Sequence, residues 1–330
     1  MITSNFLLQS SQRRQKRKAS ERHYSISSLQ FARRNVNINL TKDPELITLL
    51  KTQYRMNKNI MEIASSYIYD GELIAADSVK ARCLKDISKM EENSDQDSVF
   101  SDAENALIWI DTAGANIGDE EESQGVGEDG QAKPLPSILQ TASKFNNGEV
   151  ELVKVVYTDL RESQKLEPDQ IGVISPYKAQ VDLIRSALSN YEKDKPRCEV
   201  STVDGFQGRE KDVIILSLVR SNPKKEVGFL ADVRRLNVAI TRPKSLLVII
   251  GDSSTVTTEP FMKSIFTKIK IFGQCIPIFD LLSTINAMGM DEDEVRKYFN
   301  SGTHLTQAKD KPKDSSASPE QKGTKEDATA

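Results

Sequence analysis

The stretch EVSTVDGFQGREKDVIILSLV (199–219) places two apolar runs on either side of a short polar segment. Val200–Val203 and Val213–Val219 are rich in β-branched residues, a composition typical of strands. Gly205 and Gly208 interrupt the pattern between them, as expected for a loop. The second run is almost wholly apolar, which indicates a strand buried on both faces of a parallel sheet. This stretch therefore predicts an α/β fold.

Further strand and helix patterns alternate along the chain on both sides of this stretch. Short apolar runs predict strands at Leu107–Ile110, Ile171–Ile174 and Leu246–Ile250. Apolar residues at helical spacing predict helices over residues 57–69, 149–161, 175–188 and 232–241, with Pro176 in the first turn of the third. Buried strands separated by helices indicate a mainly parallel sheet covered on both faces. We therefore expect one open, three-layer α/β domain.

Composition limits the classes of protein that this chain can belong to. Its 330 residues carry a formal net charge of −3, and no apolar run approaches the roughly 18 residues that span a bilayer, so we expect a soluble protein without a membrane partner. Cys83, Cys198 and Cys275 are widely spaced and odd in number, which argues against a disulfide framework or a zinc cluster. The only histidines, His23 and His304, lie in segments that we interpret as tails. We therefore predict no metal site and a chemistry that uses no histidine.

Four segments differ in composition from the rest of the chain. Residues 1–45 are basic and residues 291–330 are polar, and we expect both to be disordered tails. Acidic stretches near 86–104 and 115–135 flank the short strand at Leu107–Ile110, and we interpret them as loops inserted into a domain. The predicted folded domain is therefore residues 46–290.

The N-terminal tail has three interpretations. Its cluster RRQKRK (13–18) resembles a nuclear-localisation or nucleic-acid-binding patch. An Arg- and Ser-rich segment with few acids is also typical of a mitochondrial transit peptide, and RHYS (22–25) resembles a mitochondrial processing site. The third interpretation is a solvated tail without a targeting signal. The sequence therefore leaves nuclear, cytoplasmic and mitochondrial locations open.

Polar residues cluster next to several predicted strands. Ligands of open α/β sheets bind beyond the carboxyl ends of the strands, and Ser175–Tyr177 and Asp204–Asp212 each follow a strand. Arg234, Arg235 and Arg242 recur on one predicted helix at spacings that can place them on or beside one face. An arginine offers a planar, permanently charged fork for phosphate oxygens, and one supplied by a neighbouring domain can stabilise γ-phosphoryl transfer. A single such residue is usually solvated or part of a turn, but their joint occurrence predicts phosphate handling.

Four strings, in this order, resemble the later motifs of superfamily 1 helicases: QYRM (53–56), ISPY (174–177) with Gln180, TVDGFQGRE (202–210) and LNVAITR (236–242). VRSN (219–222) and VGFL (227–230) are similar to the branch that contains the nonsense-mediated-decay helicase, and within it to the immunoglobulin-mu-switch-region-binding helicases. The similarity covers about residues 46–256. It implies a RecA-like domain of the P-loop NTPase type, the second domain of a motor in which ATP lies between two such domains and nucleic acid crosses both.

The resemblance also implies roles for individual residues. Arg55 and Arg242 would be catalytic arginines that reach the γ-phosphate, and Glu210 would contact the nucleotide side of the cleft. The nucleotide-binding residues would be Gln53, Tyr54, which would stack on the adenine, and Gly208. The nucleic-acid path would be lined by Ser175, Pro176, Tyr177, Thr202 and Asp204, which suit contacts to a phosphate backbone. For Tyr177 and Phe206, ordinary core packing is an equal alternative.

Two elements of a complete motor do not occur in the sequence. It contains no GxxxxGK[ST] phosphate loop and no apolar strand ending in Asp-Glu, which would hold the phosphates and Mg²⁺. We therefore expect ATP and Mg²⁺ as cofactors only with a first RecA-like domain, in cis or in trans, and no ATP hydrolysis above background by this chain alone.

Three hypotheses for the function follow from these observations. The chain is the C-terminal half of an ATP-dependent 5′-to-3′ helicase that acts on single-stranded DNA or RNA. Alternatively, it is a module without ATPase activity that binds nucleic acid or a protein. The third possibility, an unrelated α/β nucleotide-binding protein, has less support because no GxGxxG fingerprint follows a strand.

Overall fold

A computed structural model of the protein describes residues 50–89, 98, 100, 102, 104–115, 121–122, 125–126, 132–133, 143–189 and 197–284. The predicted tails, residues 1–45 and 291–330, lie outside these residues, as do most of the predicted insertions near 86–104 and 115–135. Those domain boundaries therefore stay predictions. Within the described ranges, no helix is both long enough and apolar enough to cross a bilayer.

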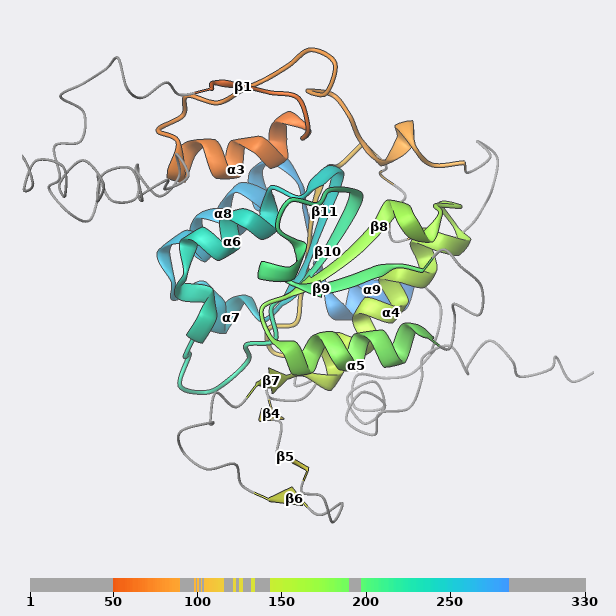
Figure 1. The fold of residues 1–330 in the computed structure, drawn as a ribbon, viewed down its shortest axis with the longest axis vertical. Helices are drawn as coiled ribbons and strands as arrows, with labels where there is room; N and C mark the ends of the chain where they lie inside the picture. The colour runs from red at the N-terminus through yellow and green to blue at the C-terminus, as the bar shows by residue number, and fades with distance from the viewer. Residues whose placement is uncertain are drawn as a thin grey trace, which may run out of the picture.

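The centre of the fold is a six-stranded sheet in which every neighbouring pair of strands is parallel (Figure 1). The strand order is β12-β3-β11-β10-β8-β9. The strands are β3 (Leu107–Asp111), β8 (Ile171–Ser175), β9 (Glu199–Thr202), β10 (Lys211–Ser217), β11 (Pro243–Gly251) and β12 (Gln274–Pro277). We call the edge where these strands begin the amino edge and the edge where they end the carboxyl edge.

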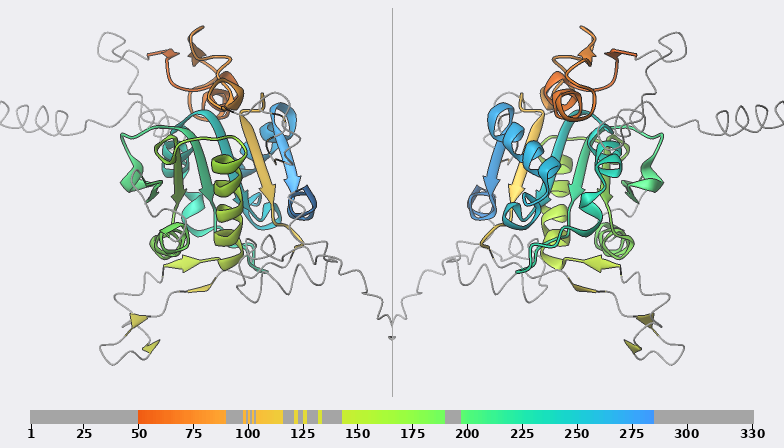
Figure 2. Two further views of the ribbon diagram at one scale, coloured as in Figure 1. Left: turned by 90° about the vertical axis from the view of Figure 1, so that its right-hand side faces the viewer. Right: turned by 90° about the vertical axis from the view of Figure 1, so that its left-hand side faces the viewer.

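Helices cover both faces of this sheet, as the side views show (Figure 2). One face is covered by α3 (Lys58–Ile68), α6 (Val233–Ile240), α7 (Ser253–Val256) and α8 (Pro260–Phe272). The other is covered by α4 (Asn147–Glu162), α5 (Lys178–Ser189) and α9 (Ile278–Thr284). The predicted three-layer α/β architecture is confirmed.

Alternation along each strand divides the apolar residues between two cores. In β3, Leu107 and Trp109 pack on the side of α8, whereas Ile108 and Ile110 pack on the side of α4. All four side chains are buried because successive side chains of a strand point to opposite faces. A strand with helices on both faces must be apolar at every position, which explains the uninterrupted Val/Ile/Leu runs of the sequence.

Local capping sets the helix boundaries. The side chain of Asn57 accepts a hydrogen bond from the Asn59 N–H, and this N-cap starts α3 at Lys58 as predicted. Asp232 caps α6 through the N–H groups of Arg234 and Arg235. The prediction for α5 was wrong by a few residues, because this helix begins at Lys178 and Pro176 lies ahead of it. The residue before a proline favours an extended conformation, so Ser175 remains the last residue of β8.

The segment 203–210 returns the chain from the carboxyl end of β9 to the amino end of β10 across the strand between them, β8. Phe206 is fully buried and packs on Gly172 of β8, where an added Cβ would lie 2.7 Å from the Phe206 Cζ. The core interpretation of Phe206 is therefore confirmed. The crossing places Asp204 near the carboxyl edge and Glu210 at the amino edge.

Smaller pairs of strands lie outside the central sheet. β1 (Thr52–Gln53) and β2 (Ile74–Ala75) form a parallel pair next to α3 at the amino edge. β4 (Glu121–Glu122) pairs with β7 (Lys144–Phe145), and β5 (Gly125–Val126) pairs with β6 (Ala132–Lys133), both antiparallel. The pair β1–β2 positions the QYRM segment above the starts of β10 and β11.

Candidate functional site

Four charged residues meet at the amino edge and form what we call the arginine cluster: Arg55, Glu210, Arg242 and Lys244. Glu210 directly precedes β10 and Arg242 directly precedes β11. These two strands are neighbours, so parallel pairing brings the two residues together. Arg55 comes from the turn between β1 and α3, and the backbone bond from the Asn57 N–H to the Lys244 carbonyl ties this turn to β11 at 2.9 Å. Three segments that are far apart in sequence thus converge.

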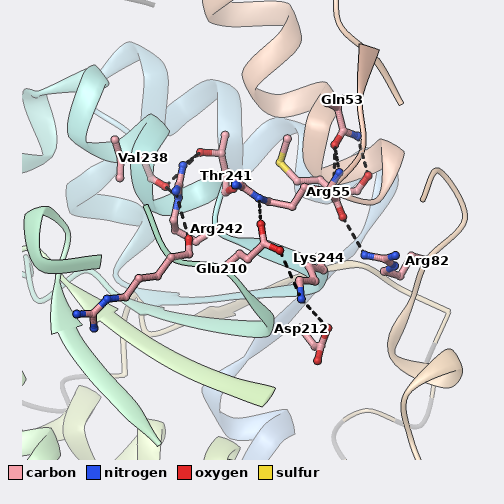
Figure 3. A network of polar contacts seen from close by, with 11 residues as sticks. Gln53, Arg55, Arg82, Glu210, Asp212, Val238, Thr241, Arg242 and Lys244 are labelled. Atoms are coloured by element: carbon pink, nitrogen blue, oxygen red, sulfur yellow. Dashed lines mark hydrogen bonds and ion pairs between the residues drawn. The ribbon is translucent and has the colours of Figure 1, made fainter. Parts of the chain in front are cut away.

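Arg55 contacts both of the other segments (Figure 3). Its Nε donates to Glu210 Oε2 at 2.5 Å, and its Nη1 donates to the Thr241 carbonyl at 3.0 Å. The Gln53 side chain shapes the turn, since its Oε1 accepts hydrogen bonds from the N–H groups of Arg55 and Met56, each at 2.8 Å. In this structure Gln53 therefore positions Arg55, and its own contact with a nucleotide stays a prediction.

Arg242 lies against the C-terminal end of α6. Its Nε donates to the Val238 carbonyl at 2.8 Å, its Nη1 to the Arg209 carbonyl at 3.2 Å and its Nη2 to Thr241 Oγ1 at 3.1 Å. In Figure 3, Thr241 and Glu210 lie between Arg242 and Arg55. Backbone carbonyls therefore hold the two guanidinium groups on either side of Glu210, which pairs with Arg55 and influences Arg242 only through its charge.

The charges of the arginine cluster are not balanced. The hydrogen bond from Arg55 to Glu210 holds the pKa of that carboxyl below its ordinary value. Burial, together with the neighbouring positive charge of Arg55, lowers the pKa of Arg242. Glu210 is the one acid among the four residues of the cluster, and a phosphate bound beside the arginines would add the negative charge that offsets the repulsion between Arg55 and Arg242. The cluster therefore fits the phosphates of a nucleotide, whereas the described residues include no group of acids suited to holding a metal ion.

Two further predicted nucleotide-binding residues lie near the arginine cluster. Tyr54 precedes Arg55, and 72% of its surface is exposed, so its ring is available to a ligand. Gly208 precedes Glu210 by two residues and has a φ of +83°, a left-handed conformation that favours glycine. The conformation of the turn thus explains this glycine. Contact between either residue and a nucleotide stays a prediction.

The residues predicted to bind nucleic acid lie at the carboxyl edge. Pro176, Thr202 and Asp204 line a small groove together with Val203, Phe229, Arg235 and Leu236. Ser175 and Tyr177 are buried behind this groove, where Ser175 Oγ accepts a hydrogen bond from the Tyr177 N–H at 3.5 Å. The structure therefore brings all five residues to one edge, three as lining and two as support.

The predicted site residues divide between the two edges of the sheet. The general rule for open α/β sheets places ligands beyond the carboxyl ends of the strands, but the arginine cluster lies at the amino edge, because the segment 203–210 crosses the sheet before it reaches Glu210. The arginines of α6 are divided in the same way, between the two ends of the helix. Arg235, in the first turn, pairs with Asp204 at the carboxyl edge, whereas Arg242, just beyond the last turn, joins the arginine cluster.

Sequence reasoning gave no role to Phe229 or Glu149 at the carboxyl edge, and it placed Arg235 only in a group of arginines on one helix. Phe229 is an exposed aromatic residue, Arg235 lies over its ring, and Glu149 is a buried carboxylate below. The VGFL string was recognised as a motif. From sequence alone, however, an apolar residue such as Phe229 is expected to be buried, so its exposure could not be predicted. An acidic residue in the first turn of a helix, such as Glu149, ordinarily interacts with the helix dipole at the surface, so nothing in the sequence predicts a buried carboxylate.

Comparisons with known proteins agree with this geometry. The model of a family described as an AAA domain matches residues 31–254 of the chain. The chain belongs to this family. Its motifs and relatives place it among the superfamily 1 helicases of the branch that contains the nonsense-mediated-decay helicase, which excludes the hypothesis of an unrelated nucleotide-binding protein.

Curated relatives cover most of the described fold. DNA polymerase alpha-associated DNA helicase A of Saccharomyces cerevisiae is 44% identical over 208 residues, which are 63% of this chain and 28% of the relative. DNA-binding protein SMUBP-2 of Rattus norvegicus is 39% identical over 240 residues, 73% of this chain and 22% of the relative. Regulator of nonsense transcripts 1 of Dictyostelium discoideum is 32% identical over 239 residues, 71% of this chain and 15% of the relative. The matched part of the chain thus spans between 15% and 28% of the length of these relatives.

Proposed function

We propose that this chain is the C-terminal motor half of an ATP-dependent 5′-to-3′ helicase that acts on DNA or RNA. The observation that carries this proposal is the arginine cluster, in which Arg55 and Arg242 meet beside Glu210 at one edge of a RecA-like sheet. Two guanidinium groups on one exposed edge suit a nucleotide that is held from the opposite side by another domain. The directionality rests on the resemblance to the helicase branch.

The residues of the arginine cluster have distinct tasks in this proposal. Arg55 and Arg242 stabilise the negative charge that develops on the γ-phosphoryl oxygens, an electrostatic task that needs fixed positive groups. Glu210 and the Thr241 carbonyl orient Arg55, and Tyr54 stacks on the adenine. A first RecA-like domain, in cis or in trans, supplies the phosphate loop and the groups that hold Mg²⁺, and the metal neutralises phosphate charge there.

The carboxyl edge forms the part of the nucleic-acid path that this chain contributes. Thr202 and the backbone around Pro176 hold phosphates of a single strand, and their groove opens to solvent. The groove lies wholly within this chain. This observation favours a second candidate function, a module that binds single strands without hydrolysing ATP.

ATP hydrolysis and duplex unwinding separate the two candidates. We expect background hydrolysis by the chain alone. Joined by a flexible linker to the first motor domain of the yeast relative, it should hydrolyse ATP with stimulation by single-stranded DNA and unwind duplexes with a 5′ tail but not a 3′ tail. The yeast domain joined to its own second half is the positive control. A joined protein that binds nucleotide and single strands but hydrolyses nothing would contradict the motor function and leave the binding module.

A nuclear or cytoplasmic location is also part of this proposal, with mitochondria as the alternative that the N-terminal tail leaves open. Microscopy of the chain carrying a C-terminal fluorescent protein distinguishes them. Deletion of the basic cluster at residues 13–18 should reduce a nuclear signal, and co-localisation with a mitochondrial dye would contradict the first assignment.

A further inference from the structure

Phe229 presents an aromatic ring to solvent at the carboxyl edge, in the 3₁₀ helix Gly228–Ala231 between β10 and α6. We propose that Phe229 is a stacking platform for an unpaired base and that Arg235 binds the phosphate beside that base. The inference rests on the proposed nucleic-acid function of the carboxyl edge. It assigns to that function two residues that the sequence resemblance did not place on the nucleic-acid path.

The ring of Phe229 is held in place although 45% of the residue is exposed. It packs edge-on against the buried ring of Tyr177, with ring centroids 5.4 Å apart and an interplanar angle of 67°. Gly228 permits this approach, because its φ is +53° and an added Cβ would lie 2.9 Å from the Tyr177 hydroxyl. The buried Arg220 fixes the preceding loop by donating from Nε to the Glu226 carbonyl at 2.8 Å.

A fixed aromatic ring on a surface suits a stacking ligand. A single exposed apolar residue is ordinary, but Phe229 differs from most because its ring is fixed by its neighbours and lies beside a groove and a cation. A loop that carried an exposed ring without support would have to become ordered on binding, at a cost in conformational entropy. Here Tyr177, Gly228 and Arg220 have already fixed the ring, so a base can stack without that entropic cost.

Arg235 adds the charge that a nucleotide requires. Its guanidinium carbon lies 5.4 Å from the centroid of the Phe229 ring, and its Nη2 lies 3.3 Å from Asp204 Oδ2. Its Nε is 3.9 Å from Asp232 Oδ2. The two carboxylates position the arginine beside the groove, and a phosphate can replace Asp204 as its partner. In this arrangement Asp204 is a positioning residue, because a carboxylate itself repels phosphate.

The groove makes a single strand the best-fitting ligand. Thr202 and Pro176 line it next to Phe229 and Arg235, so an aromatic face, a cation and a hydroxyl converge at one place. Proteins that bind single strands without reading their sequence combine an aromatic platform with positive charge in this way. Because every base has a π-face, the site predicts little sequence preference.

Phe272 provides a matched control. It is also exposed, at 42%, and also lies near a cation, with Lys268 Nζ 5.8 Å from its ring centroid. It ends α8 at the opposite, amino edge of the sheet, where Gly273 packs on Leu107 at the start of β3. A general effect of exposed aromatic residues would therefore appear equally in both variants.

The test measures binding of the full chain to two fluorescent single strands at low salt: a 12-nucleotide oligothymidine and an abasic strand of the same length. Phe229→Ala should weaken binding of oligothymidine by about 5- to 100-fold and binding of the abasic strand by less than about twofold. Phe229→Trp should restore binding, and Phe272→Ala should change neither affinity. Fluorescence of the single, buried Trp109 confirms that the alanine variants are folded, and circular dichroism confirms it for Phe229→Trp, which has a second tryptophan.

Arg235→Ala should weaken binding of both strands and reduce the slope of log affinity against log salt by about one, because one phosphate contact is lost. Wild-type affinity of Phe229→Ala for oligothymidine, or an equal loss on both strands, would overturn the stacking role. If the unaltered chain binds no single strand, both this inference and the nucleic-acid part of the proposed function fail. If it binds without depending on Phe229, only this inference fails.

Discussion

One carboxylate at each edge of the sheet shows how differently the two edges use charge. Glu210, at the amino edge, is partly exposed and pairs with Arg55, which lowers its pKa. Glu149, in the first turn of α4 at the carboxyl edge, is fully buried, and burial raises its pKa to about 7 although Ser217 and the Val219 N–H donate hydrogen bonds to it. The same functional group is therefore stabilised in its charged form at one edge and disfavoured in that form at the other.

The difference indicates where each edge keeps its ligand-binding groups. At the amino edge, ion pairs hold the charged side chains at the surface. A bound anion can take the place of a carboxylate as the partner of an arginine there. At the carboxyl edge, Glu149 serves the interior: its Oε2 accepts from Ser217 Oγ at 2.6 Å, while its buried Oε1 has no hydrogen-bond partner among the described residues. The groups available to a ligand there are instead those of the groove. Variants at the two edges should therefore separate hydrolysis, strand binding and pH dependence.

The largest expected effect is on hydrolysis and comes from the amino edge. In the protein joined to a first motor domain, Arg242→Ala should lower kcat by about 10³-fold or more with a smaller change in nucleotide affinity, because its positive charge acts mainly in the transition state. Steady-state ATPase kinetics measure both, and Arg234→Ala on the exposed start of α6 is the control. Single-strand affinity should be retained. An unchanged kcat would show that Arg242 is not a catalytic arginine.

The next effect is on stability and comes from the carboxyl edge. Between pH 4.5 and about 7 the folded chain binds more protons than the unfolded chain, since the pKa of Glu149 is raised, so stability should fall as the pH rises through this range. The loss is at most about 3 kcal/mol. Glu149→Gln keeps an oxygen acceptor for Ser217 but carries no charge, so it should be more stable than the unaltered chain above pH 7.

Urea unfolding followed through Trp109 fluorescence at pH 5, 6, 7 and 8 measures this dependence. Asp169→Asn, in the segment Pro168–Gln170 ahead of β8, is a control away from Glu149. If Glu149→Gln shows the same change of stability with pH as the unaltered chain, the buried carboxylate is not the source.

A third effect concerns the segment that joins the two edges. Gly172→Ala should destabilise the fold by about 1–3 kcal/mol, because its Cβ would lie 2.7 Å from Phe206 and 2.9 Å from Ile214. Gly172 lies in β8, beneath the crossing segment, whereas Gly208 lies in the segment itself. Gly208→Ala meets no atom within 4 Å, so it should cost only the roughly 1–2 kcal/mol of a left-handed conformation. Thermal unfolding compares them. Equal stability of Gly172→Ala and the unaltered chain would contradict the close packing.

The smallest effect is expected from Glu210→Gln. The ion pair with Arg55 is partly exposed and screened by water, so its loss should cost less than about 1 kcal/mol of stability in the chain alone. The contribution of Glu210 is present above its unfolded pKa and lost as the pH falls through its lower folded pKa, opposite in sign to that of Glu149. Unfolding at pH 3 and pH 7, with and without 0.5 M salt, measures it. A difference of several kcal/mol would contradict the partly exposed setting.

The sequence predicted the layers of this fold because buried parallel strands are apolar at every position. The strand at Ile171–Ile174 and the capped helix after Asn57 are found within one residue of their expected bounds, and the strand predicted at Leu246–Ile250 begins three residues earlier, at Pro243. The strand β12 and the helix α8 were not predicted. β12 is short and partly exposed, so its signal is weak. α8 does carry Phe261, Ile265 and Ile269 at helical spacing, but it follows the last motif, and the prediction did not extend to that region.

The candidate residues could be predicted as a set but not as two sites. Motif resemblance selected Arg55, Glu210 and Arg242, and the fold brings them together. Local sequence patterns do not determine the order of strands in a sheet, however. The sequence therefore did not reveal that the chain crosses β8 after Asp204, which places the two halves of the motif TVDGFQGRE (202–210) at opposite edges. Phe229 was missed for a related reason, because the support that exposes its ring comes from Tyr177 on another element.

The helix α6 connects the two edges of the sheet. Its eight residues span about 12 Å, with Arg235 in the first turn at the carboxyl edge and Arg242 just beyond the last turn at the amino edge. It contains no proline or glycine, the residues at which helices most often kink. We therefore expect the helix to move as one body, so that a shift of one arginine is coupled to a shift of the other.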